Sequence, residues 1–132
     1  MNELVLAIVG SVPAGFPSPA ADYMEETIDL NKHVFVRPAA TFVIRVEGDS
    51  MKDAAMPSGA LLVVDRSISP RHGHIVVAVV NGEFTVKRLI HTQAGIFLAP
   101  ENPAYQPMHI KEGMEMKIWG VVTFIIIDAT TV

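Results

Sequence analysis

The clearest structural signal in the 132-residue chain is HIVVAVVNGEFTVKRLI, residues 74–90. Two runs rich in β-branched residues, 74–80 and 83–90, flank the dipeptide Asn81-Gly82. Asn-Gly between such runs is the strongest short-range hairpin signal, because both residues accept the positive φ angles of a type I′ turn. The segment therefore predicts two antiparallel strands joined by a two-residue turn.

Short β-rich runs continue on both sides of this hairpin. Residues 41–47 alternate between apolar and polar side chains, as a half-buried strand does. Further strands are expected over residues 60–65, 96–99 and 116–128, the last of them bent near Gly120. Five to seven short strands with little helix predict an all-β fold, either a barrel or a small, strongly bent sheet.

Residues 1–40 have a different character from the rest of the chain. They contain four prolines and two glycines, which helices and central strands tolerate poorly. This composition predicts an extended N-terminal arm with a short helical turn around residues 22–28. The β-rich domain is expected to span residues 41–132.

Composition excludes several classes of function. The formal net charge is −4 and no Lys/Arg-rich block is present, which disfavours autonomous binding to nucleic acid. The chain has no cysteine, so disulfide scaffolds, thiolate metal sites and cysteine nucleophiles are excluded. His72-Gly73-His74 offers two imidazoles, but no third ligand is evident and a surface loop is the preferred interpretation. No metal or other cofactor is expected.

The N-terminal sequence bears on localisation. Its apolar run, residues 4–9, is much shorter than the ~20 residues of a membrane-spanning helix. Val12-Pro13-Ala14 resembles a signal-peptide cleavage site, but the preceding segment has no lysine or arginine. A cytoplasmic protein is therefore expected.

The segment Gly48-Asp49-Ser50-Met51 follows the strand over residues 41–47. A serine at such a junction is most often the N-cap of a following helix, here a short helical stretch over residues 52–56. The alternative is a nucleophile whose oxyanion is held by the backbone N–H groups of Ser50 and Met51. Local sequence alone leaves both roles open and favours the N-cap.

A serine nucleophile needs a base, and the five histidines form no recognisable triad motif. Lys87 and Arg88 are adjacent in a strand and face opposite sides of it, so one of them must leave the solvent face or snorkel. Burial of Lys87 would lower its pKa towards that of a usable base. A snorkelling lysine on an edge strand is the structural alternative.

The last strand, residues 116–128, is more apolar than burial of one face requires. Burial of both faces within one chain and formation of a dimer are equally compatible with this pattern.

Together, two of these motifs resemble the LexA/UmuD family of self-cleaving serine-lysine proteins. Gly48-Asp49-Ser50-Met51 is followed by Phe84-Thr85-Val86-Lys87, which places Lys87 37 residues after Ser50. The segments FPSPAADY, residues 16–23, and PSGALLVVD, residues 57–65, are also similar to segments of UmuD.

The resemblance implies the LexA/UmuD C-terminal fold, with Ser50 as nucleophile and Lys87 as general base. It assigns the cut to the Ala14–Gly15 bond, since the family cleaves Ala-Gly or Cys-Gly. Only 14 residues precede Gly15, too few for a helix-turn-helix domain, which favours a plasmid-type UmuD homologue over a repressor. The 35 residues from Gly15 to Ser50 reach ~110 Å when extended, so cleavage within one chain and across a dimer are both permitted.

The resemblance also implies partners. The RecA filament on single-stranded DNA would promote cleavage, and the trimmed homodimer would join a UmuC-like Y-family polymerase subunit in error-prone translesion synthesis. The alternative is a non-enzymatic dimeric β-rich adaptor that only binds a polymerase or another protein. Only the peptidase requires Ser50.

Overall fold

The computed structural model describes residues 5–8, 14–15 and 26–131. The chain divides into two units, residues 1–36 and 37–132. Of the helices in the described ranges, none is long and apolar enough to cross a membrane.

The first unit contains a two-stranded antiparallel sheet. Strand β1 (Val5–Ile8) pairs with β2 (Glu26–Asp29), and helix α1 (Leu30–Val34) follows directly. The Asp29 side chain caps this helix by accepting hydrogen bonds from the backbone N–H groups of Asn31 and Lys32. The helix therefore starts later than the sequence indicates.

The prediction of a helical turn around residues 22–28 is wrong in its described part. Residues 26–28 form β2, because pairing with β1 overrides their weak local preference. Residues 22–25 lie outside the described residues.

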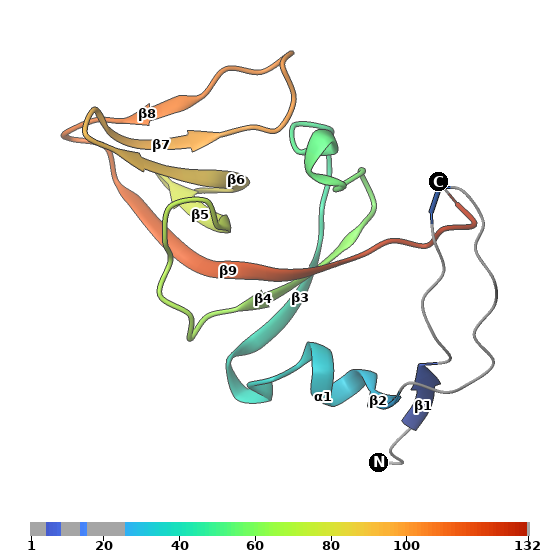
Figure 1. Ribbon diagram of the computed structural model, residues 1–132. Coiled ribbons are helices and arrows are strands. Elements are labelled where there is room, and N and C mark those ends of the chain that lie inside the picture. The colour runs from blue at the N-terminus through green and yellow to red at the C-terminus, as the bar shows by residue number, and fades with distance from the viewer. Residues whose placement is uncertain (1–4, 9–13, 16–25, 132) are drawn as a thin grey trace. The chain divides into compact units, whose positions relative to one another are not determined.

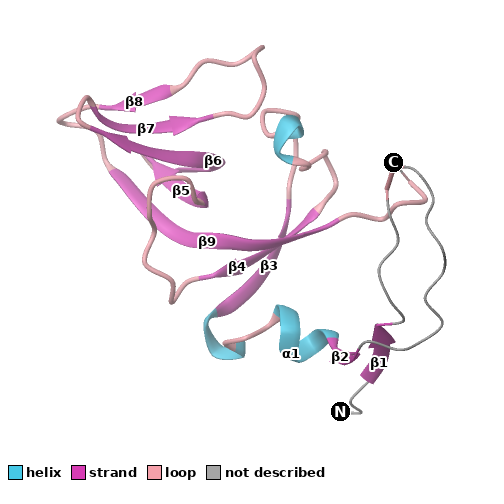
Figure 2. Cartoon of the chain, in the orientation of Figure 1, coloured by secondary structure: helices cyan, strands magenta, loops and turns pink. Residues whose placement is uncertain are grey.

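The second unit is built on one seven-stranded sheet (Figures 1 and 2). Its elements in chain order are η1 (Pro38–Ala40), β3 (Thr41–Arg45), η2 (Lys52–Ala54), β4 (Leu61–Asp65), β5 (Ile75–Val80), β6 (Glu83–Thr92), β7 (Gly95–Ala99), β8 (Met108–Ile110) and β9 (Met116–Ile126). All neighbouring strands are antiparallel, in the order β3-β4-β9-β5-β6-β7-β8.

The predicted all-β class is confirmed, and the bent sheet is the correct form of it. Within the described residues, β3 and β8 are edge strands with one partner each, so the sheet is open and not closed into a barrel. Strand β8 was not predicted, because three residues after a proline-rich connector carry almost no periodic signal.

The predicted hairpin at Asn81-Gly82 is confirmed. Strands β5 and β6 pair in register up to Val80 and Glu83, which leaves a two-residue loop. Asn81 has φ 48° and Gly82 has φ 85°, as a type I′ turn requires. This hairpin delivers β6 to the centre of the second unit.

Strand β9 bends at the predicted position. It pairs with β5 along its first half and with β4 along its second half, and it curves between them (Figure 1). Its register against β5 shifts between Gly120 and Ile118, so that Trp119 forms a bulge. A Cβ atom on Gly120 would lie 2.5 Å from a side-chain carbon of Val64, so this position requires glycine.

The core consists of two clusters of buried apolar side chains. Strand β5 contributes to both, with Val77 in one cluster and Val76, Ala78 and Val80 in the other. In β9, Val121 belongs to the second cluster and Val122 packs against the first. Burial of both faces within one chain therefore accounts for the apolar character of this part of β9.

Candidate active site

Gly48 to Met51, the serine loop below, leaves the sheet at the end of β3. Two backbone hydrogen bonds, from the N–H of Val46 to the Ala60 carbonyl and from the N–H of Gly59 to the Val46 carbonyl, extend the pairing of β3 with β4. Gly48 then adopts φ 87°, which turns the chain away from its partner strand. Met51 is 2% exposed and packs in the first core cluster, so it anchors the far end of the loop.

Ser50 is not a helix N-cap. The short helix η2 is capped at Met51 without any side-chain hydrogen bond. The N-cap interpretation is therefore wrong, and the Ser50 hydroxyl makes a different contact. Its Oγ lies 3.1 Å from the Nζ of Lys87.

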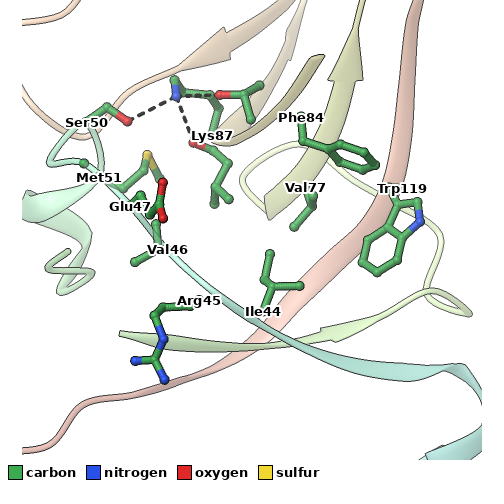
Figure 3. Close-up of a pocket in the computed structure, with 13 residues that line it drawn as sticks. Ile44, Arg45, Val46, Glu47, Ser50, Met51, Val77, Phe84, Lys87 and Trp119 are labelled. Carbon is green, nitrogen blue, oxygen red and sulfur yellow. Dashed lines mark hydrogen bonds between the residues drawn. The ribbon is translucent and has the colours of Figure 1, made fainter. Parts of the chain in front are cut away.

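Strand β6 places Lys87 opposite this hydroxyl (Figure 3). The Lys87 Nζ also donates to the hydroxyl of Thr85 at 2.7 Å and to the carbonyl of Val86 at 3.1 Å. The side chain is half-buried, and desolvation by this burial lowers the pKa of Lys87 below its usual value. The amine therefore loses its proton more easily than a lysine in water.

The adjacent Arg88 points elsewhere. Its guanidinium pairs with the Glu101 carboxylate at 2.6 Å and donates to the carbonyl of Gly73 at 2.7 Å. Both cations thus leave the plain solvent face, each through partners of its own. Lys87 lies in the cleft beside Ser50 rather than snorkelling from an edge strand, since β6 has β5 and β7 as neighbours.

Ser50 and Lys87 lie at one end of a cleft of about 570 Å³. Figure 3 shows Phe84 and Trp119 at the other end, with Ile44 and Val77 between. The rings of Phe84 and Trp119 meet edge to face, 6.2 Å apart, so this end is apolar and shaped by aromatic packing. The cleft therefore joins a polar hydroxyl–amine pair to an apolar surface.

Two N–H groups in the serine loop match the predicted oxyanion donors. In the described part of the chain, the backbone N–H groups of Ser50 and Met51 donate to no carbonyl or side-chain acceptor. They belong to the same residues as the reacting hydroxyl and its neighbour, so they are available to a bound group.

The predicted cleavage site is described only locally. Ala14 and Gly15 form a bend, and both residues are exposed. A Cβ atom on Gly15 would meet no atom within 4 Å.

The two histidines considered as metal ligands are occupied as hydrogen-bond acceptors. The Nδ1 of His72 accepts from the N–H of His91, and the Nδ1 of His74 accepts from the N–H of Arg71. Within residues 5–8, 14–15 and 26–131, no group of three His, Cys, Asp or Glu side chains is placed to hold a metal ion.

Several residues around the site were not found by sequence reasoning. Thr85 had a usable signal, because residues two apart in a strand share a face and Thr85 precedes Lys87 by two. Asn102 and Tyr105, which bind Asp49 in the serine loop, had none. Their contacts span more than 50 residues of sequence, and no local pattern indicates such pairs.

The chain matches the Peptidase S24-like family over residues 7–123. It is 54% identical to Protein SamA of Salmonella typhimurium over 111 residues, which cover 84% of this chain and 76% of SamA. It is 42% identical to Protein MucA of Escherichia coli, with 89% of this chain and 80% of MucA covered. The LexA repressor of Bordetella petrii is 36% identical over 96% of this chain and 56% of its own length. The chain therefore belongs to the Peptidase S24-like family, as a UmuD-like relative of LexA among self-cleaving serine peptidases.

Proposed function

We propose that this protein cuts its own Ala14–Gly15 bond, with Ser50 as nucleophile and Lys87 as general base. The observation that carries the proposal is the 3.1 Å contact between the Lys87 Nζ and the Ser50 Oγ in a half-buried cleft. Hydrogen-bond contact between a nucleophile and a base is the geometric requirement of covalent catalysis. The lowered pKa of Lys87 supports its role as the base, because only a neutral amine accepts a proton.

The surroundings of Lys87 favour one orientation of the neutral amine. Such an amine has two N–H donors and one lone pair. The Val86 carbonyl only accepts, and the Thr85 hydroxyl also accepts from this amine, so both N–H groups have partners. The lone pair is then left for the Ser50 hydroxyl, which donates to it. This arrangement prepares the proton transfer that activates the serine.

The reaction then follows in two stages. Lys87 takes the proton from the Ser50 hydroxyl as its Oγ attacks the Ala14 carbonyl carbon, and the oxyanion is held by the N–H groups of Ser50 and Met51. The C–N bond to Gly15 breaks, and Lys87 returns the proton to the departing Gly15 amine. Water, deprotonated by Lys87, hydrolyses the ester on Ser50 and restores the free hydroxyl.

The chemistry of the cleft suits the proposed substrate segment. Small side chains at Ala14 and Gly15 let an extended backbone approach the serine closely. Val12 and Phe16 flank the bond in the sequence, and the aromatic end of the cleft suits apolar side chains of this kind. We assign residues 1–40 as the arm that presents this bond and residues 41–132 as the catalytic domain.

The proposal extends to partners. A RecA filament on single-stranded DNA would stimulate the cleavage in the cytoplasm. The trimmed homodimer would then serve as the accessory subunit of an error-prone Y-family DNA polymerase. Family membership supports this part of the proposal, and self-cleavage can be tested without it.

Intact mass spectrometry of the full chain tests the peptidase. The protein is incubated at neutral and alkaline pH, with and without RecA and single-stranded DNA, beside a Ser50→Ala control. We expect a new species that begins at Gly15 in the wild-type chain and not in the control. Its absence under every condition would leave a binding module as the function, and its appearance in the control would exclude Ser50 as nucleophile.

A further inference from the structure

One connector touches both halves of the proposed catalytic pair. Residues 101–105, called the brace below, lie between β7 and β8. They contact the serine loop on one side and the lysine strand β6 on the other. No step of the proposed reaction uses these residues, so their buried polar contacts need an explanation.

Asn102 makes the most buried contact of the brace. Its side chain is 5% exposed, and its Nδ2 donates to the Asp49 carbonyl at 2.9 Å. Its Oδ1 accepts from the N–H of Ala104 at 3.0 Å. The two bonds together fix which way the amide faces, since one end can only donate and the other can only accept.

The Asp49 carbonyl belongs to the same peptide unit as the Ser50 N–H. A trans peptide unit is planar, and its C=O and N–H point in opposite directions. No cis peptide bond occurs in the described chain. By holding the Asp49 carbonyl, Asn102 therefore also sets the direction of the Ser50 N–H, one of the two proposed oxyanion donors.

Glu101 ties the same segment to the lysine strand. Its carboxylate pairs with Arg88, the residue after Lys87, at 2.6 Å. Its backbone carbonyl accepts from the N–H of Asp53 in η2 at 2.9 Å. One residue thus links the strand that carries the base to the short helix that follows the nucleophile.

Tyr105 adds a weaker contact at the surface. Its hydroxyl donates to the Asp49 carboxylate at 2.6 Å, and this bond raises the pKa of Tyr105 above its usual value. Asp49 is therefore held through its backbone by Asn102 and through its side chain by Tyr105.

We propose that Asn102 is a positioning residue for self-cleavage: it orients the Asp49–Ser50 peptide unit so that the Ser50 N–H faces the developing oxyanion. This inference rests on the proposed function. It assigns to Asn102 an effect on the rate at which folded protein cleaves itself, and no effect on the proton affinity of Lys87. Misplacement of catalytic groups by about 1 Å is enough to slow a reaction about 100-fold.

Asn102→Asp is the test variant, and Gln106→Glu is its matched control. The first keeps the oxygen that accepts from Ala104 and replaces the donor to Asp49 with a carboxylate oxygen. The second makes the same amide-to-acid change at an exposed position of the same connector. We expect self-cleavage of the full chain to slow about 10- to 100-fold in Asn102→Asp and to remain at the wild-type rate in Gln106→Glu.

Three further measurements distinguish positioning from stability. Rates are taken well below the thermal unfolding midpoint of each variant, and the pH at which the rate levels off is expected to stay at the wild-type value. The ¹⁵N–¹H resonance of Ser50 is expected to move more in Asn102→Asp than in Gln106→Glu. A wild-type rate together with an unmoved Ser50 resonance in Asn102→Asp would overturn the inference.

Other outcomes are also decisive. If the wild-type chain does not cleave, the proposed function fails, and the Ser50 resonance alone decides whether Asn102 orients this peptide unit. If Asn102→Asp does not fold, Asn102→Ser takes its place, because serine is too short to reach the Asp49 carbonyl. Failure of both variants to fold would assign Asn102 a purely structural role and overturn the proposal.

Discussion

The two halves of the proposed catalytic pair are held in place by different kinds of structure. Lys87 lies in β6, where β5 and β7 pair with the backbone on both sides. Ser50 lies in an irregular loop, held by separate bonds from Asn102 and Tyr105 and by the buried side chain of Met51. The position of the lysine thus follows from a repeating pattern, whereas that of the serine depends on a few individual contacts.

This difference predicts how each half responds to mutation. A strand with two neighbours shares its support among many backbone hydrogen bonds, so single side-chain changes displace it little. A loop held by three or four contacts loses a large fraction of its support with each one. Changes near Lys87 should therefore alter chemistry or overall stability, and changes in the brace should alter the rate of folded protein.

The largest effect is expected for Lys87→Ala. Loss of the base should slow self-cleavage at least about 1,000-fold and leave the fold intact, since the backbone of β6 stays paired. In the wild-type chain the neutral amine is the active form, so the rate should rise with pH and level off above the lowered pKa of Lys87. A pH series of cleavage rates by intact mass measures both effects. A wild-type rate that is flat or falls above neutral pH would exclude lysine as the base.

Gly120→Ala tests the bend of the sheet that carries both halves. The new Cβ would meet Val64, which is fully buried and stiff at χ1, so we expect a loss of about 1–3 kcal/mol in the free energy of unfolding. Urea denaturation measures it. Gly15→Ala is the control, because its Cβ would meet no atom. Equal stability of the two variants would show that β9 adjusts at this point.

Asn81→Ala tests the turn that leads into the lysine strand. Alanine at φ 48° is strained, and the bond from the Glu115 N–H to the Asn81 side chain is lost, so about 1–2 kcal/mol of stability should disappear. Asn81→Gly separates the two causes, because glycine accepts this φ but cannot form the bond. Thermal melts of both variants give the comparison. A glycine variant as unstable as the alanine variant would assign the whole effect to the lost bond.

Thr85→Val is expected to have the smallest effect. It keeps the shape of the side chain and removes one acceptor for the Lys87 amine, so the rate should fall about 5- to 10-fold through poorer orientation of the lone pair. The hydroxyl stabilises the charged amine, so its loss should lower the pKa of Lys87 further and move the pH–rate profile to lower pH. Thr27→Val, at an exposed strand position, is the control. An unchanged profile would mean that Thr85 does not contact the reacting amine.

Predictions from the sequence succeeded where the signal was periodic or local. Alternation predicted the strands around Ile44 and Val86, and the preference of Asn81-Gly82 for positive φ predicted the hairpin. The two failures lie at the ends of helices. The turn expected around residues 22–28 is partly β2, and the helix after Ser50 is capped at Met51. A cap depends on one or two hydrogen bonds, and sequence propensity ranks such alternatives only weakly.

By itself, the sequence determined the strand pattern, the turn and the pairing of a serine motif with a lysine motif that marks the family. These features depend on neighbouring residues or on a motif, so they can be read without coordinates. Only the tertiary structure decided that Lys87 meets Ser50, that Thr85 and Val86 orient the amine, and that Asn102 holds the peptide unit before the serine. The physical reason is that these are contacts between distant segments. They form only because the bent sheet brings β6 and the brace beside the serine loop.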